Sequence, residues 1–280
     1  IRVLLFLSGA FAKGHTAILR NSDRRKNNMT EHEKTSGKDI DMTDLPQKGE
    51  KFVPQLETPL RRKIITIPEV IYKASGLLIM RRRIKSVIFT TDIAIMRNHN
   101  ADALMVVYPF TPELVITQAA MSVANVPVFA GVGGGTTTGN RSIGIAFQAE
   151  LMGAAAVVVN SPTSNLVISG MCRSVDIPVI ATVASFYDDI EGKVNAGAKI
   201  LNISGSRDTP ELVRKTRELV GPEYPIIATG GPTEESILET IRAGANTITY
   251  TPPSVAEIFA DTMQLYRDQS AHKAKGSRFE

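Results

Sequence analysis

The chain has 280 residues, of which 43% are apolar and 21% charged, and its formal net charge is +4. This composition excludes a mostly disordered chain. The single cysteine, Cys172, excludes an internal disulfide framework and a multi-cysteine zinc or iron–sulfur site. It also fits a reducing compartment, so we predict a cytoplasmic protein. No apolar run approaches the roughly 18 residues of a membrane span, and we expect no membrane partner.

The positive charge is concentrated in one short stretch. Residues 61–85 carry a net charge of +7, whereas residues 86–280 carry −5. The basic stretch includes Arg81, Arg82 and Arg83. It is either a solvated surface or a nucleic-acid contact, and the acidic remainder of the chain favours the solvated surface.

Residues 1–60 lack apolar periodicity and are predicted to be a disordered leader or an upstream extension. The apolar stretch from Val3 to Ala12 resembles a signal-peptide core with a weak basic flank. The alternative is a native start at Met29 or Met42, which would leave residues 1–28 outside the protein.

From residue 64 onward, short apolar runs alternate with segments of helical spacing. Continuous Val, Ile and Ala runs of this length are typical of parallel strands covered on both faces. The predicted strands are Ser86–Thr90, Leu104–Tyr108, Val128–Gly131, Ala156–Asn160, Val179–Val183, Ile200–Ser204, Ile226–Thr229 and Thr247–Tyr250. The clearest predicted helices between them are Pro112–Ala124, Ser142–Met152, Pro210–Val220 and Glu234–Ala243.

Eight evenly spaced strand–helix units predict a (β/α)8 barrel over residues 61–268. An open doubly wound sheet is the alternative, but no dinucleotide fingerprint follows the first strand. We expect a helix over Ile67–Arg83 to close the bottom of the barrel, and a flexible tail over residues 269–280.

Barrels of this kind build their sites from the loops that follow the strands. Here those loops are rich in Gly, Ser, Thr and Asn, and none holds a histidine, cysteine or glutamate. His99 falls before the second strand, on the opposite face. A histidine metal site and a Ser-His-Asp triad are therefore not expected. Cys172 falls within the fourth helix, where we expect a packing residue rather than a nucleophile.

Two glycine-rich loops are candidate phosphate sites. Gly230 and Gly231 follow the seventh strand and precede a helix, and Thr251 follows the eighth. Such amides and helix ends commonly hold phosphate, although the glycines would also suit a tight turn. The second loop contains Gly134 and Gly135 and is followed by Arg141. It is expected either to bind an oxyanion, with Arg141 as a clamp, or to act as a lid.

The segment Ile226–Gly231, followed by Ala243–Ile248, resembles the aldolase-type and ribulose-phosphate-binding barrels, which include the 2-keto-3-deoxy-6-phosphogluconate aldolases and phosphosugar epimerases. Residues 64–267 also resemble bacterial barrels labelled as hydrolases. The resemblance implies a small phosphorylated substrate. It departs at one position: Asn202 stands where those aldolases carry a Schiff-base lysine, and Lys199 lies three residues earlier.

Without a histidine, cysteine or Schiff-base lysine at the strand ends, the candidate catalytic groups are carboxylates and side-chain amides. Asp92 and Asp188 follow the first and fifth strands, where each is either an acid/base group or a helix cap. Asn160 and Asn202 end even-numbered strands and are expected to hold a carbonyl or enediolate oxygen.

The sequence therefore predicts an enzyme of the lyase or isomerase kind that acts on a sugar phosphate or a keto-acid phosphate. Hydrolysis, a flavin oxidoreductase and a non-catalytic metabolite sensor are the alternatives. The cofactor is left open, since Mg²⁺ could bind the Asp188 region and FMN could use the loops after strands seven and eight. A homo-oligomer is possible, and nucleic acid is not an expected partner.

Overall fold

The computed structural model describes residues 63–276, together with 54, 56 and 58, and gives no account of side chains beyond residue 270. The chain divides into two units, Ile1–Leu56 and Glu57–Glu280, and the second contains the fold. The predicted leader, residues 1–60, thus lies almost entirely outside the described residues.

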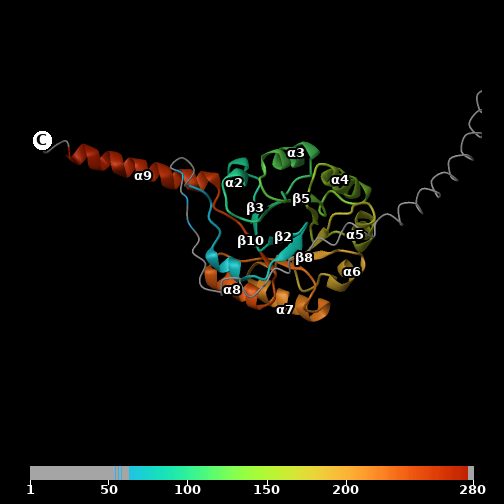
Figure 1. Ribbon diagram of the computed structural model, residues 1–280. Coiled ribbons are helices and arrows are strands. Elements are labelled where there is room, and N and C mark those ends of the chain that lie inside the picture. The colour runs from blue at the N-terminus through green and yellow to red at the C-terminus, as the bar shows by residue number, and fades with distance from the viewer. Residues whose placement is uncertain (1–53, 55, 57, 59–62, 277–280) are drawn as a thin grey trace, which may run out of the picture. The chain divides into compact units, whose positions relative to one another are not determined.

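The fold is a closed barrel of eight parallel strands, as predicted (Figure 1). Neighbours around the barrel follow chain order, and the last strand pairs with the first. The strands are β3 (Ser86–Phe89), β4 (Ala103–Val106), β5 (Val128–Gly133), β6 (Ala156–Val159), β7 (Val179–Val183), β8 (Ile200–Ile203), β9 (Ile226–Thr229) and β10 (Thr247–Tyr250).

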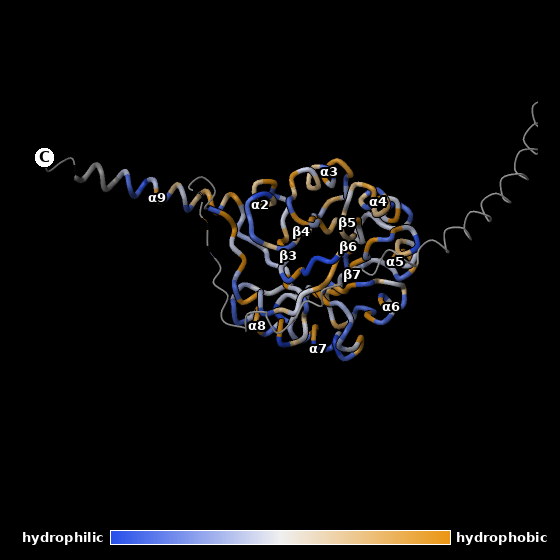
Figure 2. Tube along the Cα trace, viewed as in Figure 1, coloured by the Kyte–Doolittle hydropathy of each residue, from blue (hydrophilic) through white to orange (hydrophobic). Residues whose placement is uncertain are grey.

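Helices follow the strands and form the outer ring. They are α2 (Ile93–Arg97), α3 (Leu114–Val123), α4 (Asn140–Leu151), α5 (Asn165–Cys172), α6 (Ile190–Asn195), α7 (Thr209–Val220, after the short helix η3, Ser206–Asp208) and α8 (Glu234–Arg242). The last helix, α9 (Val255–Gly276), extends beyond this ring (Figure 1). Figure 2 shows hydrophobic and hydrophilic residues on each helix of the ring, as expected where one face packs on the strands. Helix α9 continues through the first part of the predicted tail.

The strands separate two hydrophobic clusters. Inward-facing residues such as Val87, Phe129, Ile180 and Ile227 fill the barrel, while the alternate residues pack against the helices. This division follows from the two-residue period of a strand and explains why each run is apolar on both faces.

The predicted helix over Ile67–Arg83 is wrong. The structure places there a short helix, η2 (Glu69–Lys73), and an antiparallel hairpin of β1 (Leu77–Ile79) and β2 (Arg82–Ile84). Gly76 has φ +83°, which ends helical geometry, and Met80 and Arg81 form the turn with positive φ. Leu77, Ile79 and Ile84 are buried with the inward-facing barrel residues.

The hairpin therefore closes the end of the barrel at which the strands begin. Thr247, at the start of β10, donates its hydroxyl hydrogen bond to the carbonyl of Ile84 at 2.7 Å. The exposed face of the hairpin carries Arg81, Arg82 and Arg83. The basic stretch therefore lies at the end of the barrel opposite the carboxyl ends of the strands.

Candidate functional site

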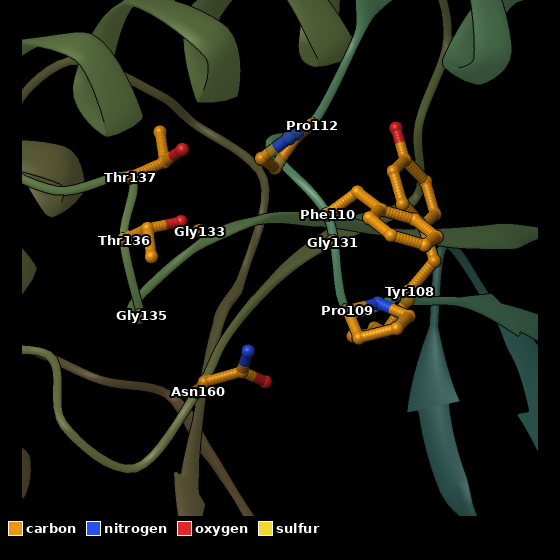
Figure 3. A pocket seen from close by; sticks show the side chains of 11 residues that line it. Tyr108, Pro109, Phe110, Pro112, Gly131, Gly133, Gly135, Thr136, Thr137 and Asn160 are labelled. Atoms are coloured by element: carbon orange, nitrogen blue, oxygen red, sulfur yellow. The ribbon is translucent and has the colours of Figure 1, made fainter.

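A cavity of about 220 Å³ lies where β4, β5 and β6 end (Figure 3). Three loops contribute to it. The lining residues are Val107, Tyr108, Pro109, Phe110, Pro112, Gly131, Gly133, Gly135, Thr136, Thr137 and Asn160. It is smaller than the roughly 300–1,000 Å³ of pockets for drug-sized ligands, so it suits a small metabolite or one part of a larger one.

The glycine-rich loop after β5 is shaped by its own hydrogen bonds. A register shift between Gly131 and Gly133 interrupts the pairing with β6, and Gly133 and Gly134 take φ values of +125° and +110°. The N–H of Gly134 donates to the carbonyl of Thr137 at 2.8 Å, and the Ser142 hydroxyl donates to the same carbonyl at 3.0 Å. The loop is thus an ordered turn at the cavity wall.

Helix α4 begins directly after this loop. Its N-cap is Gly139, which has no side chain to bond the first N–H groups. Within the described residues, the N–H groups of Gly135 and Thr136 also have no hydrogen-bond partner. Unpaired amides and the positive end of the helix dipole favour an anion at this position.

Asn160 forms the opposite wall. Its N–H donates to the carbonyl of Gly133 at 3.0 Å, and its carbonyl accepts from the N–H and hydroxyl of Thr163 at 3.1 and 2.8 Å. These backbone bonds fix the loop while the amide side chain stands toward the cavity (Figure 3). Asn160 can therefore hydrogen-bond a ligand oxygen.

Aromatic rings form the third wall. Phe110 is 76% exposed, and Tyr108 lies beside it (Figure 3). The Tyr108 hydroxyl accepts a 2.8 Å hydrogen bond from the N–H of Glu113, which precedes α3. Neither aromatic residue is among the predicted site residues, although the Tyr-Pro-Phe run at the end of a predicted strand was a usable signal.

Asp92 and Asp188 are both engaged in local structure. Asp92 caps α2 by accepting from the N–H groups of Ala94 and Ile95. Asp188 accepts from the Ser161 hydroxyl at 2.7 Å and from the N–H groups of Ala184 and Ser185 at 2.8 and 3.0 Å. Neither residue lines the cavity.

Lys193 completes a network that ties the loop after β6 to the loop after β7. Its ammonium donates to the carbonyl of Ser161 at 2.8 Å, and the side chain is 3% exposed. Burial lowers the pKa of Lys193, and the carboxylates of Asp188 and Asp189 offset part of that effect. Because Ser161 directly follows Asn160, this network supports the cavity wall from behind.

Asp188 gives a pH prediction. Partial burial raises its pKa, but the hydrogen bonds from Ser161, Ala184 and Ser185 outweigh burial, and the pKa is lowered from its ordinary value. A lowered folded-state pKa contributes stability above the unfolded-state pKa of about 4, and that stability is lost as pH falls through the folded-state pKa.

We therefore expect Asp188→Asn to be less stable than the wild type at neutral pH and the difference to shrink below about pH 4. Melting temperatures across this range would check it, with Ser161→Ala, which removes one donor, falling between the two. A constant difference at all pH values would contradict this role.

The other predicted phosphate ligands lie apart from the cavity. A side chain on Gly230 would place its Cβ 2.7 Å from Ile248 and 2.8 Å from Ile237, so close packing of α8 on the sheet already requires this glycine. Gly231 has φ +80°, and Thr251 is exposed. At the start of α8 a Thr233–Ser236 capping box and two glutamates occupy the helix end, and carboxylates there compete with an anionic ligand.

Two of the predicted phosphate ligands belong to the glycine-rich loop. Gly135 lines the cavity, and Gly134 packs against the backbone of Asn160 behind it. Arg141 is exposed in the first turn of α4 and does not line the cavity. Phosphate binding by these residues and by the strand-seven loop stays a prediction.

The remaining chemistry-bearing residues lie elsewhere. Lys199 is exposed just before β8, toward the closed end. Cys172 is the last residue of α5, where burial raises the pKa of its thiol. Among the described residues, no three His, Cys, Asp or Glu side chains cluster as metal ligands would, and no described helix is long and apolar enough to cross a bilayer. Mg²⁺ and FMN stay open possibilities from the sequence.

No family model matches the chain, and no curated protein matches it. Several solved structures are similar to the chain. A 2,3-dimethylmalate lyase, described as a PEP mutase/isocitrate lyase superfamily member, has a TM-score of 0.53 at 14% identity, covering 73% of this chain and 86% of its own. Phosphoenolpyruvate phosphomutase from Streptomyces platensis subsp. rosaceus has a TM-score of 0.51 at 17% identity, covering 74% and 86%.

An oxaloacetate acetylhydrolase is also similar, with a TM-score of 0.51 at 13% identity and coverage of 70% and 82%. At these identities the likeness shows the fold alone. The chain shares the barrel fold of these proteins.

Proposed function

We propose that this chain is a lyase-type enzyme that binds a small metabolite carrying a phosphate or carboxylate group in the cavity between β4, β5 and β6. The observation that carries the proposal is the convergence of the glycine-rich loop and the Asn160 amide on one cavity, with the uncapped start of α4 directly after that loop. These groups offer hydrogen-bond donors and a positive dipole end, which together suit an oxyanion.

The similar structures support the same substrate class. Their names describe enzymes that act on dimethylmalate, phosphoenolpyruvate and oxaloacetate, all small acids or phosphorylated acids. We also propose that the chain is related to the ribulose-phosphate-binding barrels and that it is a lyase rather than an isomerase. These two finer assignments rest on the sequence resemblance.

Tyr108 is the residue we assign to proton transfer. Of the eleven lining residues, it alone has an ionisable side chain, and a phenol hydroxyl can donate a proton to a substrate oxygen. The Glu113 N–H fixes its position at 2.8 Å.

The same observation favours a second candidate, a barrel that binds its metabolite without turnover. Acid–base chemistry commonly uses both an acid and a base, whereas the lining residues include one ionisable side chain. Product analysis with each ligand that binds separates the two, and it also detects hydrolysis. Flavin absorbance of the purified protein tests the oxidoreductase alternative.

Asn160→Ala tests the site. Melting temperatures of the full chain would be measured with phosphate, pyruvate, oxaloacetate, phosphoenolpyruvate and glycerol phosphate, because a ligand that binds the folded state raises the melting temperature. Hydrogen bonds to charged groups contribute about 1.5–3 kcal/mol, so we expect the variant to bind such a ligand at least about tenfold more weakly.

Asn98→Ala is the matched control. Asn98 is exposed at the end of α2, where its amide donates to the carbonyl of Ala94 at 2.8 Å. The Asn98→Ala variant should bind the ligand with the affinity of the wild type. The proposed function is overturned if none of these anions raises the melting temperature of the wild type.

A further inference from the structure

A row of polar side chains faces the inside of the barrel next to the cavity. Ile180 and Ile200 pair in register on β7 and β8 and belong to the inner cluster. Two residues further along each strand, Thr182 and Asn202 pair in the same way and face the same side. The inside of the barrel thus changes from apolar to polar toward the ends of these strands.

The row begins at the cavity. Val159 on β6 pairs with Ala181 on β7, so one residue further on Asn160 lies level with Thr182. Asn160 lines the cavity, and Asn202 follows Thr182 on the next strand. Asn160, Thr182 and Asn202 therefore form one row along the inner wall of the barrel, which starts at the cavity.

On β9 and β10 the row lies two residues further along the strands, because the register partner of Asn202 on β9 is the apolar residue Ile227. Thr229 lies two residues after the inner residue Ile227, and its hydroxyl donates to that of Ser204 at 3.4 Å. Thr249 pairs with Thr229 and lies two residues after Thr247, whose hydroxyl bonds the hairpin inside the barrel. Hydroxyl groups from three consecutive strands therefore extend the row.

Two groups in this row are unpaired. Asn202 donates from its amide nitrogen to the Thr182 hydroxyl at 3.2 Å. Within the part of the chain that the structure describes, Asn202 Oδ1 and Thr249 Oγ1 have no hydrogen-bond partner, and these side chains are 7% and 6% exposed. A buried polar group without a partner is costly unless a ligand or solvent satisfies it.

We propose that this row is a second subsite, which binds hydroxyl groups of a polyhydroxylated ligand whose oxyanion rests on the glycine-rich loop. Asn202 Oδ1 accepts only, so it pairs with a hydroxyl and not with a keto oxygen. Thr249 accepts and donates. The inference rests on the proposed function and narrows its substrate class to sugar phosphates and sugar acids, rather than short keto acids.

The experiment compares ligands that share an anion and differ in hydroxyl groups. Glycerol phosphate is paired with propyl phosphate, and sorbitol 6-phosphate with hexyl phosphate, each titrated against the full chain. We expect the hydroxylated member to bind at least about tenfold more tightly, because a site built to bond a hydroxyl discriminates against the analogue that lacks it.

Thr249→Val and Asn202→Leu should remove this preference and leave the alkyl phosphates unchanged. Thr216→Val is the control, since Thr216 is fully buried in α7 and its hydroxyl donates to the Leu212 carbonyl at 2.7 Å. It should lower the melting temperature and keep the preference. Thr249→Val of the ligand-free protein should melt at or above the wild-type temperature, because its hydroxyl has no protein bond to lose.

The outcomes separate the two proposals. Equal binding within each pair, or a preference that survives both inner variants, overturns the hydroxyl subsite and leaves the proposed function standing. A melting temperature of Thr249→Val several degrees below that of the wild type also overturns it, because the hydroxyl then has a structural partner. If no anion binds the wild type, the proposed function fails and the subsite fails with it.

Discussion

Replacing Gly134 by alanine should destabilise the protein by about 3 kcal/mol and abolish ligand binding at the cavity. Gly134 has φ +110°, which alanine rarely adopts. Its Cβ would overlap Thr163 Oγ1 and stand 2.7 Å from the N and 2.9 Å from the carbonyl oxygen of Asn160. The glycine-rich loop would separate from the Asn160 wall, so stability and binding should fall together.

Gly135→Ala provides a control one residue away. Gly135 lines the same cavity, has no positive φ, and an added Cβ meets nothing within 4 Å. We expect its free energy of unfolding to stay within about 0.5 kcal/mol of the wild type. Denaturant titration of both variants measures the difference. If Gly134→Ala and Gly135→Ala lose similar amounts of unfolding free energy, the close approach of this loop to Asn160 is not the reason that position 134 requires a glycine.

Arg217→Met should destabilise the protein by about 3–4 kcal/mol, which lowers the melting temperature by roughly 6–16 °C in a domain of this size. The Arg217 guanidinium lies at the closed end of the barrel and donates to acceptors in the segments before β9 and β10. These acceptors are the carbonyls of Gly221, Pro222, Tyr224 and Gly244 and Asn246 Oδ1. Removing the guanidinium leaves several partly buried carbonyls without a donor.

Arg214→Met on the same helix should have almost no effect. Arg214 pairs with Glu239 at 2.9 Å, but both side chains are more than half exposed. Exposed ion pairs contribute about 0–1 kcal/mol. If the two variants fold, their ligand affinity at the cavity, which lies at the opposite end of the barrel, should be unchanged. If Arg217→Met melts within a few degrees of Arg214→Met, the five hydrogen bonds are not a major source of stability.

The strands could be predicted because their signal is local. Each apolar run ends within two residues of a proline, glycine or polar residue, and Val179–Val183, Ile226–Thr229 and Thr247–Tyr250 match the predicted bounds. The hairpin could not be predicted in the same way. Its turn consists of Met80 and Arg81, which replace the Asn or Gly that usually marks such a turn, and the burial of Leu77 and Ile79 depends on the finished barrel.

The site was harder to predict because the same residue types serve structure and chemistry. Gly230 resembles a phosphate ligand in sequence, yet its spacing from Ile237 and Ile248 already requires a glycine. Asp92 follows a strand as a general base would, and it caps a helix. Tyr108 and Asn160 follow different strands and line one cavity only after the barrel closes, so no local motif joins them.

The hairpin that fills the lower end of the barrel makes the route through the molecule one-ended. Leu77, Ile79 and Ile84 close the axis below the inner cluster, so a compound that reaches Asn202 has to enter and leave through the end at which the strands terminate, where the glycine-rich loop lies. A product still bound at that loop would then block the next substrate. Product release and substrate entry would compete for one passage, and product inhibition should be competitive with substrate.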